Sequence, residues 1–316
     1  MNALRCHLDD VPFDAVLYST PPITFNKVIS YVKNRYGAKS YLLLKDIFPQ
    51  NAVDLGMMSR SGVLYKMFRR KEQELYRISD WIGCMSPANV EYVLRHNPSV
   101  ESERVHVNPN SIEPQHLPTI YVDAVRRKYA LPQDRPIFIY GGNLGRPQGV
   151  DFLLRVLDHY LGDNRLFFVV VGSGTEYPKI ERWFAERRPA NARLMERLSK
   201  EEYDRLVQAC DVGMIFLDAR FTIPNYPSRL LSYLQYRMPV IAATDPNTDL
   251  GAIAEKGGYG LWAQSGDMGA FAAHVERLLD ARLRCEMGEN GYRHLLSNYT
   301  IDKSYRIIIK HIAQDV

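Results

Sequence analysis

One stretch of the chain, residues 211–245, constrains the fold more than any other. It reads DVGMIFLDARFTIPNYPSRLLSYLQYRMPVIAATD, and its pattern predicts an apolar strand, a loop, an amphipathic helix and a second apolar strand. Strands joined through a helix pair in parallel, and a parallel sheet needs helices on its faces, so this stretch predicts an α/β domain. The helix begins at Arg229, and a helix N-terminus with a basic residue is a site for an anion such as a diphosphate.

The same alternation of strands and helices runs through the rest of the chain. A polar, proline-rich segment at residues 109–118, PNSIEPQHLP, interrupts it and is the best linker candidate. Strands are expected at residues 14–19, 41–45, 81–85, 105–108, 136–140, 166–171, 212–217, 240–243 and 260–263. Helices are expected at residues 24–36, 62–79, 86–95, 150 onward, 177–187, 229–236, 268–279 and 301 onward. We therefore predict two Rossmann-like domains, at residues 1–117 and 118–300, with a C-terminal helix at 301–316 that packs back on the first.

Composition excludes several classes of protein. The 316 residues are 46% hydrophobic and 24% charged, as in soluble globular proteins, and no apolar run approaches the ~20 residues of a membrane span. The start, MNALRCHLDDVPFD, lacks the apolar core of a secretory signal, so we expect a cytoplasmic protein. The four cysteines and eight histidines show no metal-ligand spacing, which indicates reduced thiols, no bound metal and no cofactor.

The net charge of +4 does not by itself indicate a nucleic-acid partner. The segment from Leu64 to Lys71, LYKMFRRK, mixes apolar and basic residues at helical spacing. One interpretation is an ordinary solvated helix face. The other is a weak peripheral contact with anionic lipid headgroups at the inner face of the cell membrane.

A glycine-rich loop follows the strand expected at residues 136–140. Gly141 and Gly142 would let backbone amides approach a phosphate, Arg146 adds a fixed charge, and Gly149 permits a tight turn into a helix. An ordinary strand-to-helix turn has the same composition, so this alternative stays open. The spacing fits neither GxGxxG nor GxxxxGK[ST], which leaves the dinucleotide fingerprint and the P-loop unsupported.

Three further side chains are candidates for the site. Arg229 lies in the first turn of a helix, where a positive charge is unfavourable, so either an anion binds there or the side chain extends its charged head into water. Ser232, one turn later, either bonds a ribose hydroxyl or is a small packing residue. Asp46, at the tip of an apolar strand, either acts on a substrate or caps the following turn.

Five motifs, in order, resemble one known family. They are LKDIFPQNAVDLG from Leu44, HVNPNSIEP from His106, FIYGGNLGRPQGVDFLL from Phe138, VVGSG from Val170 and PNYPSRLLSYLQYRMPVIA from Pro224. Together they resemble the retaining, GT-B-fold glycosyltransferases of glycosyltransferase family 4, in the branch that builds bacterial capsule and O-antigen. The resemblance covers nearly the whole chain.

The resemblance implies a donor site in the C-terminal domain and an acceptor site in the N-terminal one. Gly142, Arg146 and Arg229 would contact the donor diphosphate, Ser232 would face the ribose, and Asp46 would lie near the reacting sugar. The base would lie at Glu196 and Arg197. The neighbouring positions expected to complete the donor site are Asn143, Gly174, Ser228 and Leu230. Of these residues, Asp46, Arg146 and Arg229 are the catalytic candidates, and the family usually needs no bound metal.

Three departures from the family pattern stand out. Pro224 and Ser232 occupy positions where many relatives carry glutamates, and Gln148 occupies the position of a lysine that Arg146 would replace. Relatives also begin with a glycine-rich strand-loop-helix, so about 70 to 90 residues of the N-terminal domain are expected to be missing here. On this interpretation the N-terminal Rossmann-like domain is incomplete.

The leading hypothesis is a hexosyl- or N-acetylhexosaminyl-transferase for cell-surface polysaccharide. It would move a sugar from a nucleotide-diphosphate donor, a UDP-sugar, to a glycan or a polyprenyl-linked oligosaccharide. The first alternative is a truncated or non-catalytic paralogue that binds a nucleotide or a partner. The second is a sugar-nucleotide 2-epimerase, which shares the two-domain architecture.

Overall fold

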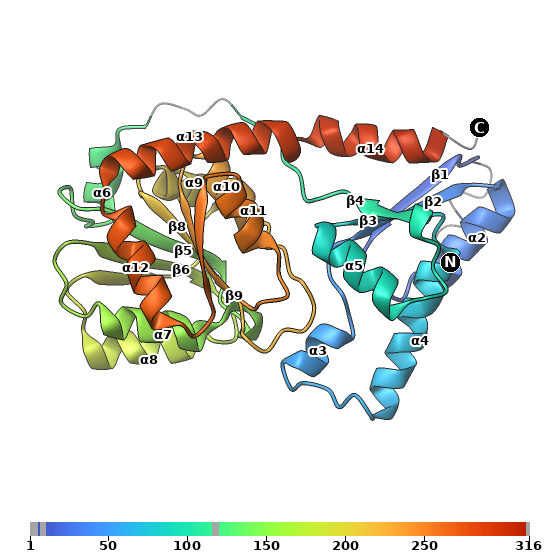
Figure 1. Cartoon of the computed structure of the whole chain (residues 1–316), viewed down its shortest axis with the longest axis horizontal. Coiled ribbons are helices and arrows are strands. Elements are labelled where there is room, and N and C mark those ends of the chain that lie inside the picture. The colour runs from blue at the N-terminus through green and yellow to red at the C-terminus, as the bar shows by residue number, and fades with distance from the viewer. Residues whose placement is uncertain (1–5, 7–10, 116–119, 314–316) are drawn as a thin grey trace. The chain divides into compact units, whose positions relative to one another are not determined.

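The computed structural model describes residues 6, 11–115 and 120–313, and the chain divides into two compact α/β units (Figure 1). The first unit comprises Met1–Ser111, Phe221–Tyr226 and Ile301–Val316, and the second comprises Ile112–Arg220 and Pro227–Thr300. The expected boundary between Leu117 and Pro118 lies outside the described residues, so these domain limits stay a prediction.

The first unit is built on a parallel sheet in the order β1-β2-β3-β4. Its elements are β1 (Ala15–Ser19), α2 (Asn26–Tyr36), β2 (Lys39–Leu44), α3 (Gln50–Asp54), α4 (Val63–Ile78), β3 (Trp81–Cys84), α5 (Pro87–His96), a 3-10 turn at Ser102–Arg104, β4 (Val105–Val107) and α14 (Ile301–Ala313). The helix α2 ends because Gly37 adopts a left-handed conformation (φ 70°) and its N–H bonds to the carbonyl of Lys33.

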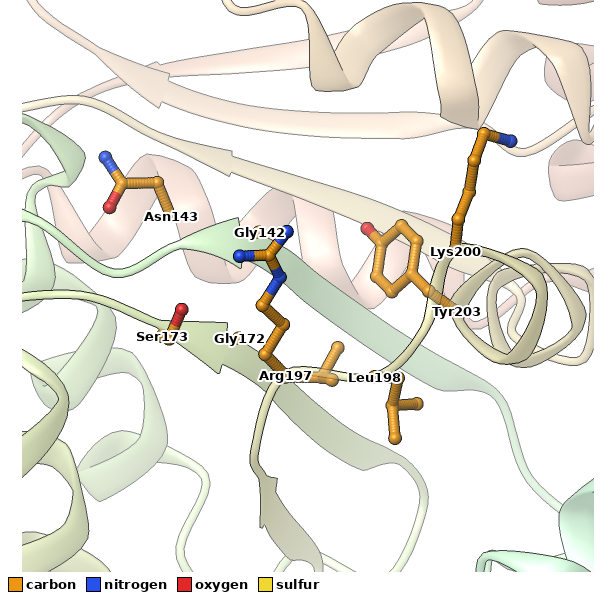
Figure 2. A pocket seen from close by; sticks show the side chains of 9 residues that line it. Gly142, Asn143, Gly172, Ser173, Arg197, Leu198, Lys200 and Tyr203 are labelled. Atoms are coloured by element: carbon orange, nitrogen blue, oxygen red, sulfur yellow. The ribbon is translucent and has the colours of Figure 1, made fainter.

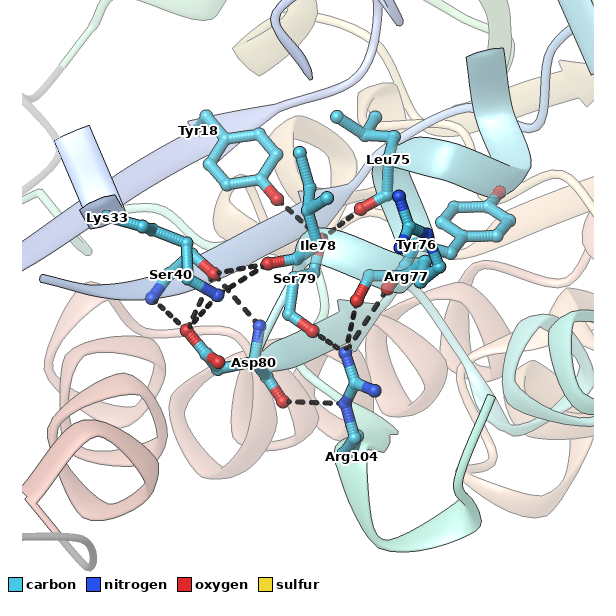
Figure 3. Close-up of polar contacts among 10 residues, drawn as sticks. All are labelled: Tyr18, Lys33, Ser40, Leu75, Tyr76, Arg77, Ile78, Ser79, Asp80 and Arg104. Atoms are coloured by element: carbon cyan, nitrogen blue, oxygen red, sulfur yellow. Dashed lines mark hydrogen bonds and ion pairs between the residues drawn. The ribbon is translucent and has the colours of Figure 1, made fainter. Parts of the chain in front are cut away.

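A polar network fixes the end of α4 against the sheet (Figure 3). The guanidinium of Arg104 donates to the carbonyls of Tyr76, Arg77 and Ser79, which are acceptors left open at a helix C-terminus. Asp80 accepts from the backbone N–H of Ser40 at 2.7 Å. These bonds hold the turn between α4 and β3 and thereby set where α4 lies on the sheet.

The C-terminal helix α14 belongs to the first unit through polar and aromatic contacts. Ser304 donates to Asn108 Oδ1 at 2.8 Å, and the His311 ring stacks on His106 with centroids 3.6 Å apart. Trp81 meets His311 edge to face. Burial and the neighbouring His311 lower the pKa of His106 to about 4, so this ring is neutral at pH 7.

The second unit contains a parallel sheet in the order β10-β9-β8-β5-β6-β7. Its strands are β5 (Ile137–Asn143), β6 (Phe167–Ser173), β7 (Ala192–Met195), β8 (Val212–Phe216), β9 (Val240–Thr244) and β10 (Gly260–Gln264). Its helices are α6 (Val122–Lys128), a 3-10 turn at Arg146–Gln148, α7 (Val150–His159), α8 (Tyr177–Arg187), α9 (Lys200–Gln208), α10 (Arg229–Gln235), α11 (Leu250–Lys256), α12 (Met268–Leu278) and α13 (Ala281–Asn298).

Both faces of this sheet are buried, which explains its nearly continuous apolar strands. On one face, Phe138 and Tyr140 of β5 join a core with residues of α7, α8 and α12. On the other face, Tyr233 of α10 packs on the backbone of β8, where a Cβ at Gly213 would lie 2.4 Å from its ring. The Tyr233 hydroxyl donates to the carbonyl of Ile139, which ties α10 to the centre of the sheet.

The α/β class and the parallel sheets that the sequence predicted are confirmed. Each strand and helix expected from the sequence is present, with ends that differ by a few residues. The structure adds elements that the sequence analysis did not predict, namely α3, α6, β7, α9 and α13. No helix in the described residues is both long and apolar enough to cross a membrane.

Candidate functional site

The carboxyl ends of β5 and β6 lie unusually close together in the second unit. Their pairing continues through Gly142 opposite Gly172 and Asn143 opposite Ser173. Gly172 has a φ of 153°, and a Cβ there would lie 1.9 Å from the carbonyl oxygen of Gly142. Only glycine permits this approach, and the result is a surface made largely of backbone, which can come close to a ligand.

A pocket of about 480 Å³ opens beside these two strand ends (Figure 2). It lies where ligands bind in open parallel sheets, at the carboxyl ends of the strands. We refer to it as the strand-end pocket. Its lining consists of Gly142, Asn143, Val171, Gly172, Ser173, Arg197, Leu198, Lys200 and Tyr203.

Two cations enter the lining from the segment between β7 and α9. The side chain of Arg197 extends toward the strand end at Gly142 (Figure 2) and has no hydrogen bond or ion pair with any described residue. Lys200, in the first turn of α9, pairs with Asp204 at 2.7 Å. Arg197 therefore offers an uncompensated positive charge, and Lys200 a partly compensated one.

Tyr203 of α9 forms the inner wall of the strand-end pocket. A Cβ at Gly141 would lie 2.2 Å from its hydroxyl, so the ring rests directly on the backbone of β5. Burial raises the pKa of Tyr203 to about 12. Together with Val171 and Leu198, the ring gives this wall an apolar face against which a flat heterocycle can pack.

Arg229, the first residue of α10, lies behind the glycine-rich loop. Its guanidinium covers the Tyr140 ring at 4.3 Å, and Nη2 donates to Gln148 Oε1 at 2.6 Å. The same Nη2 lies 4.0 Å from where a Cβ on Gly142 would stand, whereas Nη1 is buried with no partner among the described residues. A guanidinium held by an aromatic face, with a donor still unused, can accept an anion at Gly142.

The structure brings together some of the predicted donor-site residues. Gly142, Asn143 and Arg197 line the strand-end pocket, and Arg229 lies next to its lining residue Gly142. The predicted residues that do not line it are Arg146, Gly174, Glu196, Ser228, Leu230 and Ser232.

The reasons for their positions differ. The side chain of Arg146 is 60% exposed, and its Nε lies 3.8 Å from Glu176 Oε1. Gly174 packs on Leu144, because a Cβ there would lie 2.5 Å from the Leu144 carbonyl. Leu230 is fully buried in the core beneath α10. Glu196 is exposed next to the pocket residue Arg197.

Three pocket residues were missed by the sequence analysis: Leu198, Lys200 and Tyr203. The last two lie on α9, which was not predicted. Its signal was available, because Ser199 followed by Glu202 is a capping box, and Ser199 Oγ accepts from the Glu202 N–H at 3.3 Å. Val171, Gly172 and Ser173 belong to the VVGSG motif, and β6 extends to Ser173 through its pairing with β5.

Asp46 lies in the first unit, directly after β2. Both its carboxylate oxygens accept from Asn51 Nδ2, at 3.1 and 2.9 Å, and burial raises the pKa of this carboxyl. The preceding Lys45 has no side-chain partner among the described residues, and burial lowers the pKa of its amine to about 8. The sequence analysis passed over Lys45, a buried titratable amine next to Asp46 in the sequence.

The strand-end pocket can hold a phosphate against glycine backbone and cations, and an aromatic ring against Tyr203. No group of three or more His, Cys, Asp or Glu side chains that could hold a metal ion occurs in the described part of the chain. A phosphate bound in the strand-end pocket would be near the positive charges of Arg197, Lys200 and Arg229.

Comparison with known proteins places this geometry in context. The sequence model of the family described as glycosyl transferases group 1 matches residues 122–294, more than half of the chain and all of the strand-end pocket. The probable glycosyltransferase WbjE of Pseudomonas aeruginosa is 22% identical over 270 residues, which are 85% of this chain and 67% of that protein. WcaI of Escherichia coli (strain K12) is 24% identical over 224 residues, which are 69% of this chain and 54% of that protein.

Among solved structures, HepE (Alr3699) of Anabaena in complex with UDP-glucose is similar in fold. It superposes with a TM-score of 0.73 at 13% identity, over 94% of this chain and 78% of HepE. This likeness confirms the GT-B fold that the sequence predicted. The chain spans from about half to two thirds of the length of the two curated relatives.

Proposed function

The chain belongs to the glycosyl transferases of group 1, and on this premise we propose that it moves a sugar from a UDP-sugar to a glycan or a lipid-linked oligosaccharide. The observation that carries the proposal is the strand-end pocket, where glycine backbone, the uncompensated Arg197 and the wall of Tyr203 meet. The name of WcaI refers to colanic acid biosynthesis, and HepE was solved with UDP-glucose, which favours a polysaccharide product and a uridine donor.

The proposed chemistry follows from the charges at this pocket. The bond between the sugar C1 and the diphosphate breaks, a new bond forms between C1 and the oxygen of an acceptor hydroxyl, and the proton of that hydroxyl passes to water. Negative charge then grows on the departing diphosphate. Arg197 and Lys200, which line the strand-end pocket, and Arg229, which lies next to Gly142, would stabilise that charge because they are in place before the bond lengthens.

The remaining predicted residues keep proposed roles. Arg146 would approach the diphosphate from the loop, at the cost of its contact with Glu176, and Ser232 would contact the ribose. Asp46, held by Asn51, would orient the acceptor hydroxyl or stabilise positive charge on the sugar. The role of Asp46 predicts that its loss lowers turnover without weakening UDP binding.

Membrane contact through Leu64–Lys71 is also a proposal. Val63, Leu64 and Met67 of α4 are 83%, 60% and 46% exposed, and Lys66 and Arg70 are exposed beside them. Within the same segment, Arg69 pairs with Glu72 and is not available to lipid. The purified chain is expected to sediment with anionic vesicles and not with neutral ones, and Leu64→Ser with Met67→Ser should abolish this difference.

Turnover of UDP-sugars tests the proposed function. The purified chain, mixed with a panel of UDP-hexoses and UDP-N-acetylhexosamines, is expected to release UDP faster when a lipid-linked oligosaccharide is added. UDP release together with an epimerised free sugar, without any acceptor, would identify a 2-epimerase. UDP binding without any turnover would identify a non-catalytic paralogue, a result that the neutral Pro224 and Ser232 would then explain.

A further inference from the structure

Gln148 occupies the position where many relatives carry a lysine, so this chain lacks that positive charge at the end of the glycine-rich loop. The residue ends the 3-10 turn Arg146–Gln148, and its Oε1 lies 2.6 Å from Arg229 Nη2. A lysine could not make this contact, because an ammonium group has only donors and would add a second positive charge beside the guanidinium. The residue types at positions 148 and 229 are therefore chemically linked.

The backbone around Gln148 is fixed by the neighbouring loops. The Gln148 N–H donates to the carbonyl of Gly145 at 3.0 Å. The next residue, Gly149, has a φ of 56°, and a Cβ there would lie 2.7 Å from the carbonyl oxygen of Leu217. The turn is thereby pressed against the residue that follows β8, so the Gln148 side chain extends from a rigid base.

Arg229 and Tyr140 share two acceptors at this turn. Gln148 Oε1 accepts from Arg229 Nη2 at 2.6 Å and from the Tyr140 hydroxyl at 3.1 Å. The carbonyl oxygen of Asn143 lies 3.5 Å from the same Nη2 and 3.3 Å from the same hydroxyl. Burial raises the pKa of Tyr140, so its hydroxyl keeps its proton and donates at neutral pH. Because both neighbours are donors, the Gln148 amide must present its oxygen to them.

These contacts order the guanidinium of Arg229 before any ligand binds. The Tyr140 ring lies 4.3 Å from its centre, Gln148 holds Nη2, and that nitrogen lies 4.0 Å from where a Cβ on Gly142 would stand. A free arginine side chain loses much rotamer freedom when it binds an anion. An arginine that is already held beside the strand-end pocket has lost that freedom in advance, which favours binding.

We propose that Gln148 is a positioning residue: it holds Arg229 beside Gly142, and it acts on the donor diphosphate through that arginine and not by its own contact. This inference rests on the proposed function, because the diphosphate of UDP is the ligand that Arg229 would meet. It goes further, since it makes Gln148 the partner of Arg229 and not the site of a lysine that Arg146 replaces.

Calorimetric titration of UDP into single and double variants of the full chain tests this assignment. Gln148→Leu removes the acceptor and is expected to weaken UDP binding at least fivefold. Gln148→Lys is expected to weaken it as much, although it restores a positive charge. Combined with Arg229→Ala, Gln148→Leu should have no further effect, whereas combined with Arg197→Ala it should keep its full effect. Gln133→Lys adds the same charge in the exposed loop before β5 and should stay within twofold of the unaltered chain.

Chemical modification of arginine provides a second readout that does not require UDP. Phenylglyoxal reacts with accessible guanidinium groups, and peptide mass spectrometry gives the rate at each arginine. Arg229 should react at least fivefold faster in Gln148→Leu and Gln148→Lys than in the unaltered chain. Gln148→Glu keeps an acceptor oxygen and should restore the slow reaction. Arg187, which pairs with Asp158 on the surface, is the internal reference.

The two readouts separate this inference from the proposed function. UDP affinity that is unchanged or higher in Gln148→Leu or Gln148→Lys would overturn the assignment, and so would additive losses in the double variant with Arg229→Ala. Equal labelling rates of Arg229 in all four proteins would overturn it as well. Absence of UDP binding in the unaltered chain would instead overturn the proposed function, while the labelling rates would still show whether Gln148 holds Arg229.

Discussion

Two pockets of nearly the same volume differ in construction: the strand-end pocket of the second unit and a pocket among α3, α4 and α5 of the first, which we refer to as the α4 pocket. The strand-end pocket is walled by glycine backbone beside Arg197, whereas the α4 pocket is lined by side chains that include the Arg69–Glu72 pair and the exposed Arg60. Each lining has an arginine without a partner among the described residues, but only the strand-end pocket lets glycine backbone approach a phosphate. The difference teaches that glycine at the strand ends, and not the number of charged residues, distinguishes the phosphate site.

Both units bury ionisable groups whose pKa values are shifted by that burial. In the first unit these include Lys45, Asp46, Glu72 and His106, and in the second they include Asp245, whose pKa burial raises to about 6. Because burial lowers the pKa of Lys45 to about 8, a rise of pH above neutral should act on the first unit through this amine, whereas Asp245 should respond below neutral pH.

The largest effect is expected from a substitution that disrupts the strand-end pocket and leaves the first unit unchanged. Gly172→Ala forces a methyl group against the Gly142 carbonyl, so the free energy of unfolding should fall by about 2 kcal/mol and UDP binding should be lost. Denaturant titration and calorimetry measure the two effects. Gly269→Ala in α12, where the nearest atom lies at 3.5 Å, should leave both within error. Full UDP affinity in Gly172→Ala would show that the close strand ends are not the binding surface.

Two arginines of the second unit provide a sharper test of charge. Arg229→Ala should weaken UDP binding by about 10- to 100-fold, because a charge-assisted hydrogen bond to phosphate is lost. Arg146→Ala should weaken it by less than about fivefold, since Arg146 is largely exposed and already faces Glu176. Arg187→Ala on α8 removes the same charge from a surface pair with Asp158 and is the control. Equal losses of UDP affinity in the two alanine variants would show that Arg146 contributes to phosphate binding as much as Arg229 does.

The smallest expected effect concerns the pH response of the first unit. Burial lowers the pKa of Lys45 from 10.5 to about 8, so the unfolded chain binds more protons between these values and stability rises with pH across that window. Lys45→Met should flatten the rise and increase the free energy of unfolding at pH 7.5 by about 1 kcal/mol, after discount for partial exposure. UDP affinity should stay constant between pH 7 and 9. If the free energy of unfolding rises with pH equally steeply in Lys45→Met, another group causes the rise.

Much of the fold was predictable from the sequence, because apolar runs and helix signals are local. The strand and helix at residues 212–217 and 229–236 appear as β8 and α10 almost residue for residue. The helix α9 was missed although Ser199 and Glu202 marked its start. Attention to that capping box would have supplied Lys200 and Tyr203, the residues that complete the strand-end pocket.

The site was less predictable, because side-chain direction depends on residues far away in the sequence. Arg146 was chosen for its charge, but the position of Glu176 draws it away from the pocket. The α4 pocket left no motif at all, since it forms only when Thr222 joins Asp54 and Gln50, more than 160 residues earlier in the chain. Glycine spacing, in contrast, did identify Gly142, because a close backbone approach requires glycine itself.

The measurement that tests the central claim most directly is calorimetric titration of UDP into the unaltered chain and into Arg197→Ala. Arg197 has no partner among the described residues, so its removal should not unfold the protein and should act only on a ligand in the strand-end pocket. We predict one UDP site per chain, weakened at least tenfold in Arg197→Ala, with an unchanged melting temperature. UDP binding of equal affinity in both proteins would contradict the account.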